Sequence, residues 1–236
     1  MTYNFSTCYG YSMPRNQRTD VGGIIYHIIN RANARMRIFN EPKDYQLFEI
    51  TLAEAKEQVP MRILAYCIMP NHWHLVLHPK KDGDLQKFMG WFTLTHTRRW
   101  HVFHKTIGSG HLYQGRYKSF PVQTNEYFIQ LCKYVERNPL RAKLIKRAEN
   151  WKWSSLWRRQ HGTKEQQKLL SQWPTGIPDD YLSYVNEPEK DDELEEVRYS
   201  VNRGKPYGRE QWTSRIVDRF NLESTIRDPW RPKKRP

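Results

Sequence analysis

The chain has 236 residues, with 39 Lys and Arg against 25 Asp and Glu, and its formal net charge at pH 7 is +14. A hydrophobic content of 38% is enough for a core, so the composition excludes a chain that is disordered throughout. No apolar run approaches the ~20 residues of a membrane span, the N-terminus lacks the apolar core of a signal peptide, and three cysteines are too few for a disulfide framework. We expect a soluble, cytoplasmic protein with no membrane partner, whose positive charge favours a polyanion.

The positive charge is unevenly distributed along the chain. Residues 187–196 hold seven acids and one lysine, net −6, which leaves +20 for the rest, and the last ten residues are net +4. The acidic run precedes Arg198 and Arg203, the order of charges that the helix dipole favours. We interpret this run as a solvated helix face and expect the basic remainder to bind the polyanion.

The first predicted elements are a strand and a helix. Residues 1–22 are polar and rich in turn formers, and we interpret them as an N-terminal lead-in. Residues 24–31 (IIYHIINR) are β-branched and aromatic, which favours a strand. Pro42 then opens a helical pattern with Tyr45 and Phe48 on its apolar face.

The next segment predicts two strands and a long helix. Residues 62–69 (RILAYCIM) and 72–78 (HWHLVLH) are apolar and β-branched, and the Pro70-Asn71 pair between them favours a tight turn. Asp84 is predicted to cap an amphipathic helix of several turns.

A short strand and a second amphipathic helix follow. Residues 117–123 (YKSFPVQ) predict the strand, and Pro121 indicates an edge position because it cannot donate a backbone hydrogen bond. Thr124 or Asn125 is predicted to cap the helix, which ends near Asn138 because a proline comes next.

The element order predicts an α+β fold, in which an antiparallel sheet carries helices mainly on one face. We assign residues 23–160 to this α+β domain and residues 161–178, which are polar and contain two prolines, to a linker. Residues 179–236 are predicted to form a helical C-terminal extension with a basic tail.

Strand alternation divides residues 72–78 into two faces. The core face carries Trp73, Leu75 and Leu77, and the other carries His72, His74, Val76 and His78. Two imidazoles at i and i+2 can bind a metal together when a third ligand arrives from elsewhere. The alternative is an ordinary solvated strand face. A chain with nine histidines can contain a His-x-His pattern by chance.

The helix ending near Asn138 carries a second candidate pair. Tyr134 and Asn138 are spaced i and i+4, which places them only ~40° apart around the helix. A phenol and an amide oxygen presented together can act as a nucleophile and a metal ligand. The alternative is that Tyr134 is a packing tyrosine and Asn138 a helix-terminal residue.

Several ordered blocks of the chain resemble a known family. The runs YHIINRANARMRIF, AYCIMPNHWHLVLHP, YQGRYKSF and YVERNPLRA resemble the single-tyrosine transposases of the His-hydrophobic-His (HUH) superfamily, and more narrowly the REP-associated tyrosine transposases of bacteria. The resemblance covers about residues 20–160, and the block from Met69 to His74 is highly specific. The tail GKPYG…RPKKRP is similar to the basic extension of longer members.

The resemblance implies a ferredoxin-like fold and a metal-dependent endonuclease and strand-transferase that acts on single-stranded DNA in transposition. It implies that His72 and His74 hold Mg²⁺ or Mn²⁺, and that Tyr134 is the nucleophile that forms a covalent 5′-phosphotyrosine. Asn138 matches the position where a polar residue completes the metal site. Related members often have glutamine there.

The expected partner is single-stranded DNA that contains a REP-like hairpin. Basic residues, several of them beside aromatics, are predicted to contact it: Arg31, Arg35, Arg37, Arg98, Arg99, Arg116, Lys118, Arg137 and Arg141. Within the family, the REP-associated branch resembles monomers, so we favour a monomer, although a dimer is compatible with the broader class.

Two other functions remain open at this point. One is a domesticated regulator that binds DNA hairpins without cutting them, although such a protein has no need of Tyr134. The other is a zinc protein that uses the histidine pair with Cys67 or His78. Residues 67–81 contain no acid to act as a base, which disfavours a zinc hydrolase.

Overall fold

A four-stranded antiparallel sheet is the centre of the fold. The computed structural model describes residues 18–227, and its strands are β1 (Ile25–Arg31), β2 (Met61–Met69), β3 (His72–Pro79) and β4 (Lys118–Val122). They lie in the order β2-β3-β1-β4. With a helix after β1 and another after β3, this order is the ferredoxin-like arrangement, which confirms the predicted α+β class.

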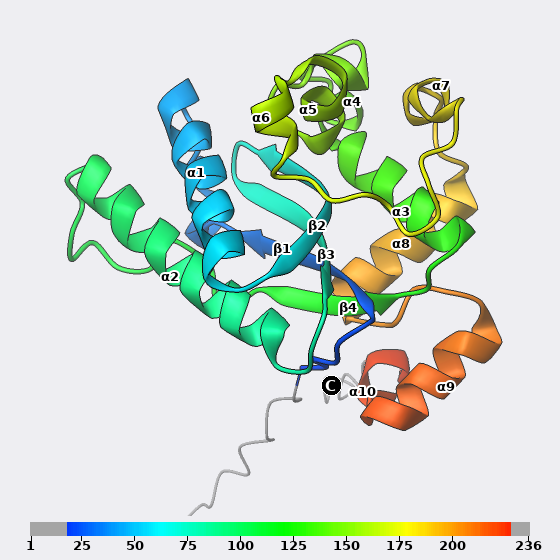
Figure 1. The fold of residues 1–236 in the computed structure, drawn as a ribbon. Coiled ribbons are helices and arrows are strands. Elements are labelled where there is room, and N and C mark those ends of the chain that lie inside the picture. The colour runs from blue at the N-terminus through cyan, green and yellow to red at the C-terminus, as the bar shows by residue number, and fades with distance from the viewer. Residues whose placement is uncertain (1–17, 228–236) are drawn as a thin grey trace, which may run out of the picture.

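Helices cover both faces of the sheet (Figure 1). On one face lie α1 (Pro42–Gln58) and α2 (Asp84–Phe103), and on the other lie α3 (Glu126–Glu136), α7 (Tyr181–Asn186) and α8 (Asp191–Arg203). The prediction of helices mainly on one face is therefore wrong. The physical reason is that β1, β2 and β3 carry apolar residues on both of their faces and are buried along almost their whole length, so both faces need covering.

The alternation of β3 sorts its side chains between these two layers. Trp73, Leu75 and Leu77 are buried in the core beneath α1 and α2. Val76 is buried in the second core, with residues of α3. His74 points to this second side and is also buried, so the face that carries the histidines is not a solvated one.

Two helix caps show how far local sequence determines helix starts. Of the two predicted caps of α3, Thr124 and Asn125, the structure has Asn125. Its side chain accepts a hydrogen bond from the backbone of Tyr127. The prediction that Asp84 caps α2 is wrong, because Asp84 is the first residue inside that helix. The carboxylate of Asp20 accepts hydrogen bonds from the backbone N–H groups of Leu85 and Gln86 instead.

Short helices follow the sheet and α3. They are α4 (Asn138–Arg141), the 3-10 helix η2 (Ala148–Asn150), α5 (Ser155–His161) and α6 (Lys164–Gln167), and a further 3-10 helix, η1 (Asn33–Arg35), follows β1. Residues 161–178, which we expected to be a linker, are packed against the sheet. Leu169 and Trp173 are buried in its two cores, and the Trp173 indole donates a hydrogen bond of 2.7 Å to the Leu64 carbonyl.

Both outer edges of the sheet are paired with later parts of the chain. Trp153 and Ser171 form backbone hydrogen bonds with β2, at 2.9 and 2.8 Å. The backbone of Tyr207 donates to Pro121 of β4 at 2.9 Å. β4 is an edge strand of the sheet, as Pro121 indicated, and the segment around Tyr207 pairs with its outer edge.

The end of the chain forms two more helices, α9 (Glu210–Phe220) and α10 (Glu223–Ile226). Before them, α8 has acids in its first turn and Arg203 in its last, as the charge order predicted, and it ends at Gly204 with φ of 74°. None of the helices in residues 18–227 is long and apolar enough to cross a membrane. Most of the predicted lead-in and the basic end of the extension lie outside the described residues.

Glu136 joins α3 to the helices that follow it, and its loss has a large expected effect on stability. Its buried carboxylate accepts hydrogen bonds from Ser155 and from the Tyr181 hydroxyl, and it pairs with Arg159 at 2.7 Å. Replacing Glu136 by Ala leaves a largely buried guanidinium unpaired, so we expect the free energy of unfolding to fall by about 3–5 kcal/mol. Urea unfolding followed by tryptophan fluorescence measures this change.

Glu126→Ala is the matched control for this experiment. Glu126 lies on the same helix and also pairs with an arginine, Arg209, at 2.7 Å, but both side chains are exposed. Its replacement should leave the urea midpoint near that of the wild type, because exposed ion pairs contribute little. Equal effects of the two substitutions would contradict a special role for Glu136.

Candidate functional site

His72 and His74 lie next to each other at the start of β3. Their ring centroids are 5.1 Å apart, and the planes are nearly perpendicular. His74 is buried and His72 is partly exposed. In the neighbouring strand, Arg31 lies opposite His72 in register. The structure therefore brings one predicted DNA-binding residue to the predicted metal ligands.

In each of the two imidazoles, the Nδ1 atom is within hydrogen-bonding distance of a neighbouring side chain. The side-chain oxygen of Asn71 lies 2.6 Å from His72 Nδ1, and Nε2 of His27 lies 2.8 Å from His74 Nδ1. Because an amide oxygen only accepts, the proton of neutral His72 is assigned to Nδ1, which leaves the Nε2 lone pair available. Within residues 18–227 neither Nε2 has a hydrogen-bond partner.

Burial keeps both imidazoles neutral. It lowers the pKa of His72 to about 4, and the positive charges of Arg31 and Arg141 act in the same direction. Burial also lowers the pKa of His74 well below its ordinary value, with smaller contributions from His27 and His72. Since a metal binds the neutral imidazole, both groups are in the required protonation state at pH 7.

His27 is a residue of this site that sequence reasoning missed. It is fully buried in β1, where burial lowers its pKa to about 3, and its Nδ1 has no hydrogen-bond partner among the described residues. A single histidine inside IIYHIINR is easily interpreted as a core residue. The available signal was alternation, which places His27 on the same face of its strand as Arg31.

Tyr134 reaches the histidine pair from α3. Its ring lies edge-on to His74 with centroids 5.9 Å apart, and the Arg141 guanidinium lies over the ring at 4.4 Å. The side chain is 8% exposed. Burial raises the pKa of its hydroxyl, and the charge of Arg141 partly offsets that effect. The structure thus brings the predicted nucleophile to a predicted metal ligand.

Asn138 lies one turn beyond Tyr134, and both its amide nitrogen and its amide oxygen are hydrogen-bonded within the protein. Its Nδ2 donates to the backbone carbonyls of Tyr134 and Val135, and its Oδ1 accepts from Arg141 at 2.9 Å. No hydrogen bond links Asn138 to either histidine within residues 18–227. Its role as third metal ligand stays a prediction, and it requires the oxygen's second lone pair.

Two of the predicted DNA-binding arginines are paired within the protein. Arg137 binds Glu189 at 2.9 Å and the carbonyls of Val185 and Asn186, and Arg141 pairs with the other oxygen of Glu189. The Glu189 side chain is only 9% exposed. The segment between α7 and α8 therefore places a carboxylate beside Tyr134, and any DNA contact by these arginines has to compete with it.

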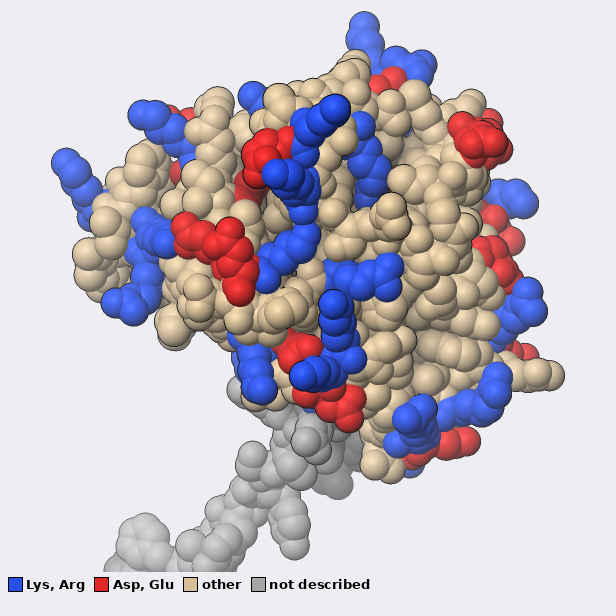
Figure 2. All heavy atoms as spheres, in the orientation of Figure 1, with Lys and Arg blue, Asp and Glu red and all other residues tan. Residues whose placement is uncertain are grey.

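The other predicted DNA-binding residues are spread over the molecule. Arg99 pairs with Glu54 of α1 at 2.7 Å, and Lys118 donates to the Asn202 carbonyl. The remaining members are exposed: Arg35, Arg37, Arg98 and Arg116. On the face shown in Figure 2, Lys and Arg side chains form a band from top to bottom, whereas acidic side chains lie in separate groups. The predicted DNA-binding residues come from several elements of the fold, so they do not form a single cluster.

The histidine pair offers two candidate metal ligands but not a complete site. In the described part of the chain, no group of three or more His, Cys, Asp or Glu side chains is placed to hold a metal ion. The two free Nε2 atoms, each with its Nδ1 fixed by a neighbour, are the arrangement that metal-binding histidines adopt. The pair fits a divalent metal that takes its other ligands from Asn138, water or substrate oxygens.

This fold and site define the chain as a member of the IS200-like transposase family. The family model matches residues 20–138, which include β1 to β4, α3, the histidine pair and Tyr134. The resemblance inferred from the ordered sequence blocks is thereby confirmed. The match ends at Asn138, so the extension after α3 lies outside it.

Two relatives narrow the comparison to one branch of the family. The chain is 21% identical over 142 residues to the REP-associated tyrosine transposase of Escherichia coli K12, an alignment that spans 58% of this chain and 78% of that protein. It also resembles the solved structure of a REP-associated tyrosine transposase bound to a REP hairpin, with a TM-score of 0.53 and 18% identity over 62% of this chain and 84% of that one. The structural similarity supports the fold.

Proposed function

We propose that this chain cuts and rejoins single-stranded DNA beside a REP-like hairpin, with Tyr134 as the nucleophile. The contact between the Tyr134 ring and His74, at 5.9 Å, carries this proposal because it unites a hydroxyl nucleophile with a metal-ligand pair. The hairpin is taken from the relative whose solved structure is bound to one. Its DNA is the polyanion that a net charge of +14 favours.

The covalent step follows from the position of the phenol. Tyr134 Oη attacks a phosphorus atom of the bound strand, and the bond from phosphorus to the 3′ oxygen breaks. The phenolic proton passes to water, and the departing oxygen takes up a proton to become a free 3′-OH. Arg141, over the Tyr134 ring, favours the phenolate. Attack by another 3′-OH on the 5′-phosphotyrosine reverses the step and joins the strands.

His72 and His74 would hold Mg²⁺ or Mn²⁺ through their Nε2 atoms, with Asn138 as the proposed third ligand. Such an ion, when bound, polarises the phosphate and offsets the charge that develops in the transition state. Asn71 and His27 keep the two rings in orientation through their Nδ1 contacts. Arg31, opposite His72, has a buried Nε without a partner in the described residues, which supports a proposed contact with a phosphate oxygen.

A second candidate function is a hairpin-binding regulator without catalysis. The observation in its favour is that Tyr134 is buried and that Glu189 occupies both Arg137 and Arg141. A single assay separates the two functions. The protein is incubated with a panel of hairpin oligonucleotides that carry single-stranded flanks, with Mn²⁺, with Mg²⁺ or with EDTA, and the products are separated on a denaturing gel.

A metal-dependent, denaturation-resistant adduct and a shortened strand are the expected products. Absence of an adduct and of a shortened strand in all three conditions, with hairpin binding detected by fluorescence anisotropy of the same mixtures, would establish the regulator instead. Adduct formation on a fully double-stranded oligonucleotide of the same sequence would contradict the preference for single strands.

His27 should affect metal affinity through His74. Replacing it by Ala removes the acceptor of the His74 Nδ1 proton, and loss of such a partner typically weakens metal binding by about 10–100-fold. His27→Gln keeps an acceptor oxygen on a side chain of similar reach, so it should restore much of the affinity. Titration of the apoprotein with Mn²⁺, followed by the electron paramagnetic resonance signal of the free ion, measures the dissociation constant.

His78→Ala is the control for this titration. His78 lies on the same strand, but its Nδ1 contacts Arg62 at 2.9 Å and it touches neither candidate ligand. Its replacement should leave Mn²⁺ affinity unchanged. Unchanged affinity in His27→Ala as well would rule out the orienting role.

A further inference from the structure

A strained turn follows β1, close to the histidine pair. In the turn 33–36, which contains η1, Ala34 and Arg35 have φ values of 50° and 57°. Residues with a Cβ atom rarely adopt this left-handed region, and two in succession are uncommon. Both residues are exposed, so packing of their side chains does not explain the conformation. Strain of this kind persists only where the surrounding structure holds it.

Backbone hydrogen bonds hold the strained turn against the loop between β2 and β3. Before the turn, the N–H of Ala32 donates to the Asn71 carbonyl at 2.9 Å. After it, the N–H of Ile38 donates to the Pro70 carbonyl at 3.0 Å. Both ends of the turn are therefore fixed to the Pro70-Asn71 pair that directly precedes His72.

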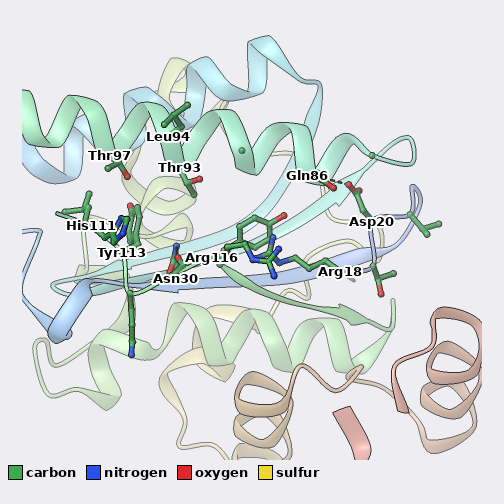
Figure 3. A pocket seen from close by; sticks show the side chains of 18 of the residues that line it. Arg18, Asp20, Asn30, Gln86, Thr93, Leu94, Thr97, His111, Tyr113 and Arg116 are labelled. Carbon is green, nitrogen blue, oxygen red and sulfur yellow. Dashed lines mark hydrogen bonds between the residues drawn. The ribbon is translucent and has the colours of Figure 1, made fainter. Parts of the chain in front are cut away.

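A second loop holds the start of the strained turn. The N–H of Asn33 donates to the Leu112 carbonyl at 2.9 Å. In the groove beside α2 that Figure 3 shows, Tyr113 of this loop lies between α2 and β1, and its hydroxyl accepts a hydrogen bond of 3.0 Å from the Trp73 indole. The turn is therefore anchored to the core on this side as well.

The Asn71 side chain joins the strained turn to His72. Its Nδ2 donates to the Arg35 carbonyl at 3.3 Å, and its Oδ1 lies 2.6 Å from His72 Nδ1. A carbonyl oxygen only accepts, so the amide has to turn its nitrogen to Arg35 and its oxygen to His72. That oxygen accepts only from the Nδ1–H tautomer of His72, the one that leaves Nε2 free for a metal.

We propose that the turn 33–36 is a positioning element, which fixes the orientation of the Asn71 amide and thereby the tautomer of His72. The proposal rests on the proposed function for the role of His72 as a metal ligand. The Arg35 carbonyl reaches Asn71 because Ala34 and Arg35 keep the left-handed conformation. A residue at position 35 that cannot take this conformation moves the carbonyl away, and the amide is then free to rotate. His72 then populates both neutral tautomers, and metal affinity falls.

A pair of substitutions at Arg35 separates the backbone from the side chain. Both Arg35→Gly and Arg35→Pro remove the guanidinium, but glycine keeps a positive φ and proline cannot. In metal-free protein at pH 7, ¹⁵N NMR of the imidazole nitrogens reports the tautomer of His72, whose signals are assigned with His72→Gln. We expect the Nδ1–H form in the wild type and in Arg35→Gly, and a mixture in Arg35→Pro. Mn²⁺ affinity, measured by electron paramagnetic resonance, should be about 10-fold lower in Arg35→Pro than in Arg35→Gly.

Lys105→Gly and Lys105→Pro are the matched controls. Lys105 is also exposed and has a φ of 54°, and its N–H donates to the carbonyl three residues earlier at 3.2 Å, as that of Arg35 does. It lies just after α2 and has no hydrogen bond to Asn71 or His72. Both variants should therefore keep the wild-type tautomer and Mn²⁺ affinity.

Two substitutions of Asn71 test whether the turn acts through this side chain. A carboxylate accepts on either side, so in the Asn71→Asp background Arg35→Gly and Arg35→Pro should bind Mn²⁺ equally. Asn71→Ala leaves the backbone of the turn unchanged and should give a mixture of His72 tautomers.

Equal tautomer populations in Arg35→Gly and Arg35→Pro would overturn the proposal. So would a wild-type tautomer in Asn71→Ala, or a difference between the two Arg35 variants that persists in the Asn71→Asp background. A protein that binds no Mn²⁺ but shows the expected tautomers retains the role of the turn and loses the proposed metal site.

Discussion

Replacing Tyr134 by Phe is expected to abolish the covalent protein–DNA adduct and to reduce cleavage by on the order of 10⁴-fold or more, because the only atom removed is the attacking oxygen. The ring keeps its edge-on contact with His74 and its place under the Arg141 guanidinium. Binding of the hairpin should therefore stay within a factor of two or so of the wild type. Adducts are quantified on denaturing gels, and binding by anisotropy.

Tyr127→Phe is the matched control, since Tyr127 belongs to the same helix but contacts Tyr207 rather than the histidines. It should form the adduct at the wild-type level. An adduct that survives in Tyr134→Phe would show that another residue is the nucleophile, and mapping the labelled peptide would identify it.

Acidification is expected to unfold the metal-free protein well before most carboxylates are protonated. Burial lowers the pKa of His27 and His96 to about 3 and that of His72 to about 4, and it lowers the pKa of His74 well below its ordinary value. In the unfolded chain these groups titrate near pH 6.5. Between pH 6.5 and the folded-state values, unfolding therefore takes up protons, and stability falls as the pH falls.

The expected size of this effect is large. Each proton taken up costs about 1.4 kcal/mol of stability per pH unit, so four histidines give a slope on the order of 5 kcal/mol per pH unit below pH 6. A domain with a typical stability of about 5–15 kcal/mol then unfolds between about pH 5 and pH 4. Urea midpoints measured from pH 7 to pH 4 give the slope, and a flat profile over that range would contradict it.

His96→Gln isolates one of the four groups, at a distance from the metal ligands. His96 is fully buried and its Nδ1 accepts a hydrogen bond of 2.8 Å from the Tyr113 hydroxyl, which accepts in turn from the Trp73 indole. Glutamine keeps an acceptor for that hydroxyl but cannot be protonated. The variant should lose about a quarter of the acid slope.

Much of the fold was predictable because its signals are local. The apolar runs at residues 24–31, 62–69 and 72–78 and the Pro70-Asn71 turn between the last two correspond to β1, β2 and β3 within a residue or so. The same alternation also predicted that His72 and His74 share a face. Such patterns involve only residues that are close in the sequence, so the sequence of a single strand is enough to reveal them.

The contacts that complete the site were not predictable in this way. Glu189 is about fifty residues from Arg137 and Arg141, inside an acidic run that resembles a solvated helix face. Most acids of that run lie in the first turns of α8, whereas Glu189 precedes the helix and its side chain is only 9% exposed. The register of β1 and β3 sets His27 opposite Val76 and His74 opposite Ile29, so the two histidines are diagonal neighbours in contact, which no periodicity within either strand reveals.

The covered edges of the sheet restrict how copies of this chain can assemble. The backbone of β2 is engaged by Trp153 and Ser171, and that of β4 by Tyr207. A strand from a second molecule could join either side of the sheet only by displacing one of these segments. Growth of a continuous intermolecular sheet is consequently blocked at both ends. Edge-to-edge aggregation is therefore disfavoured in the folded state.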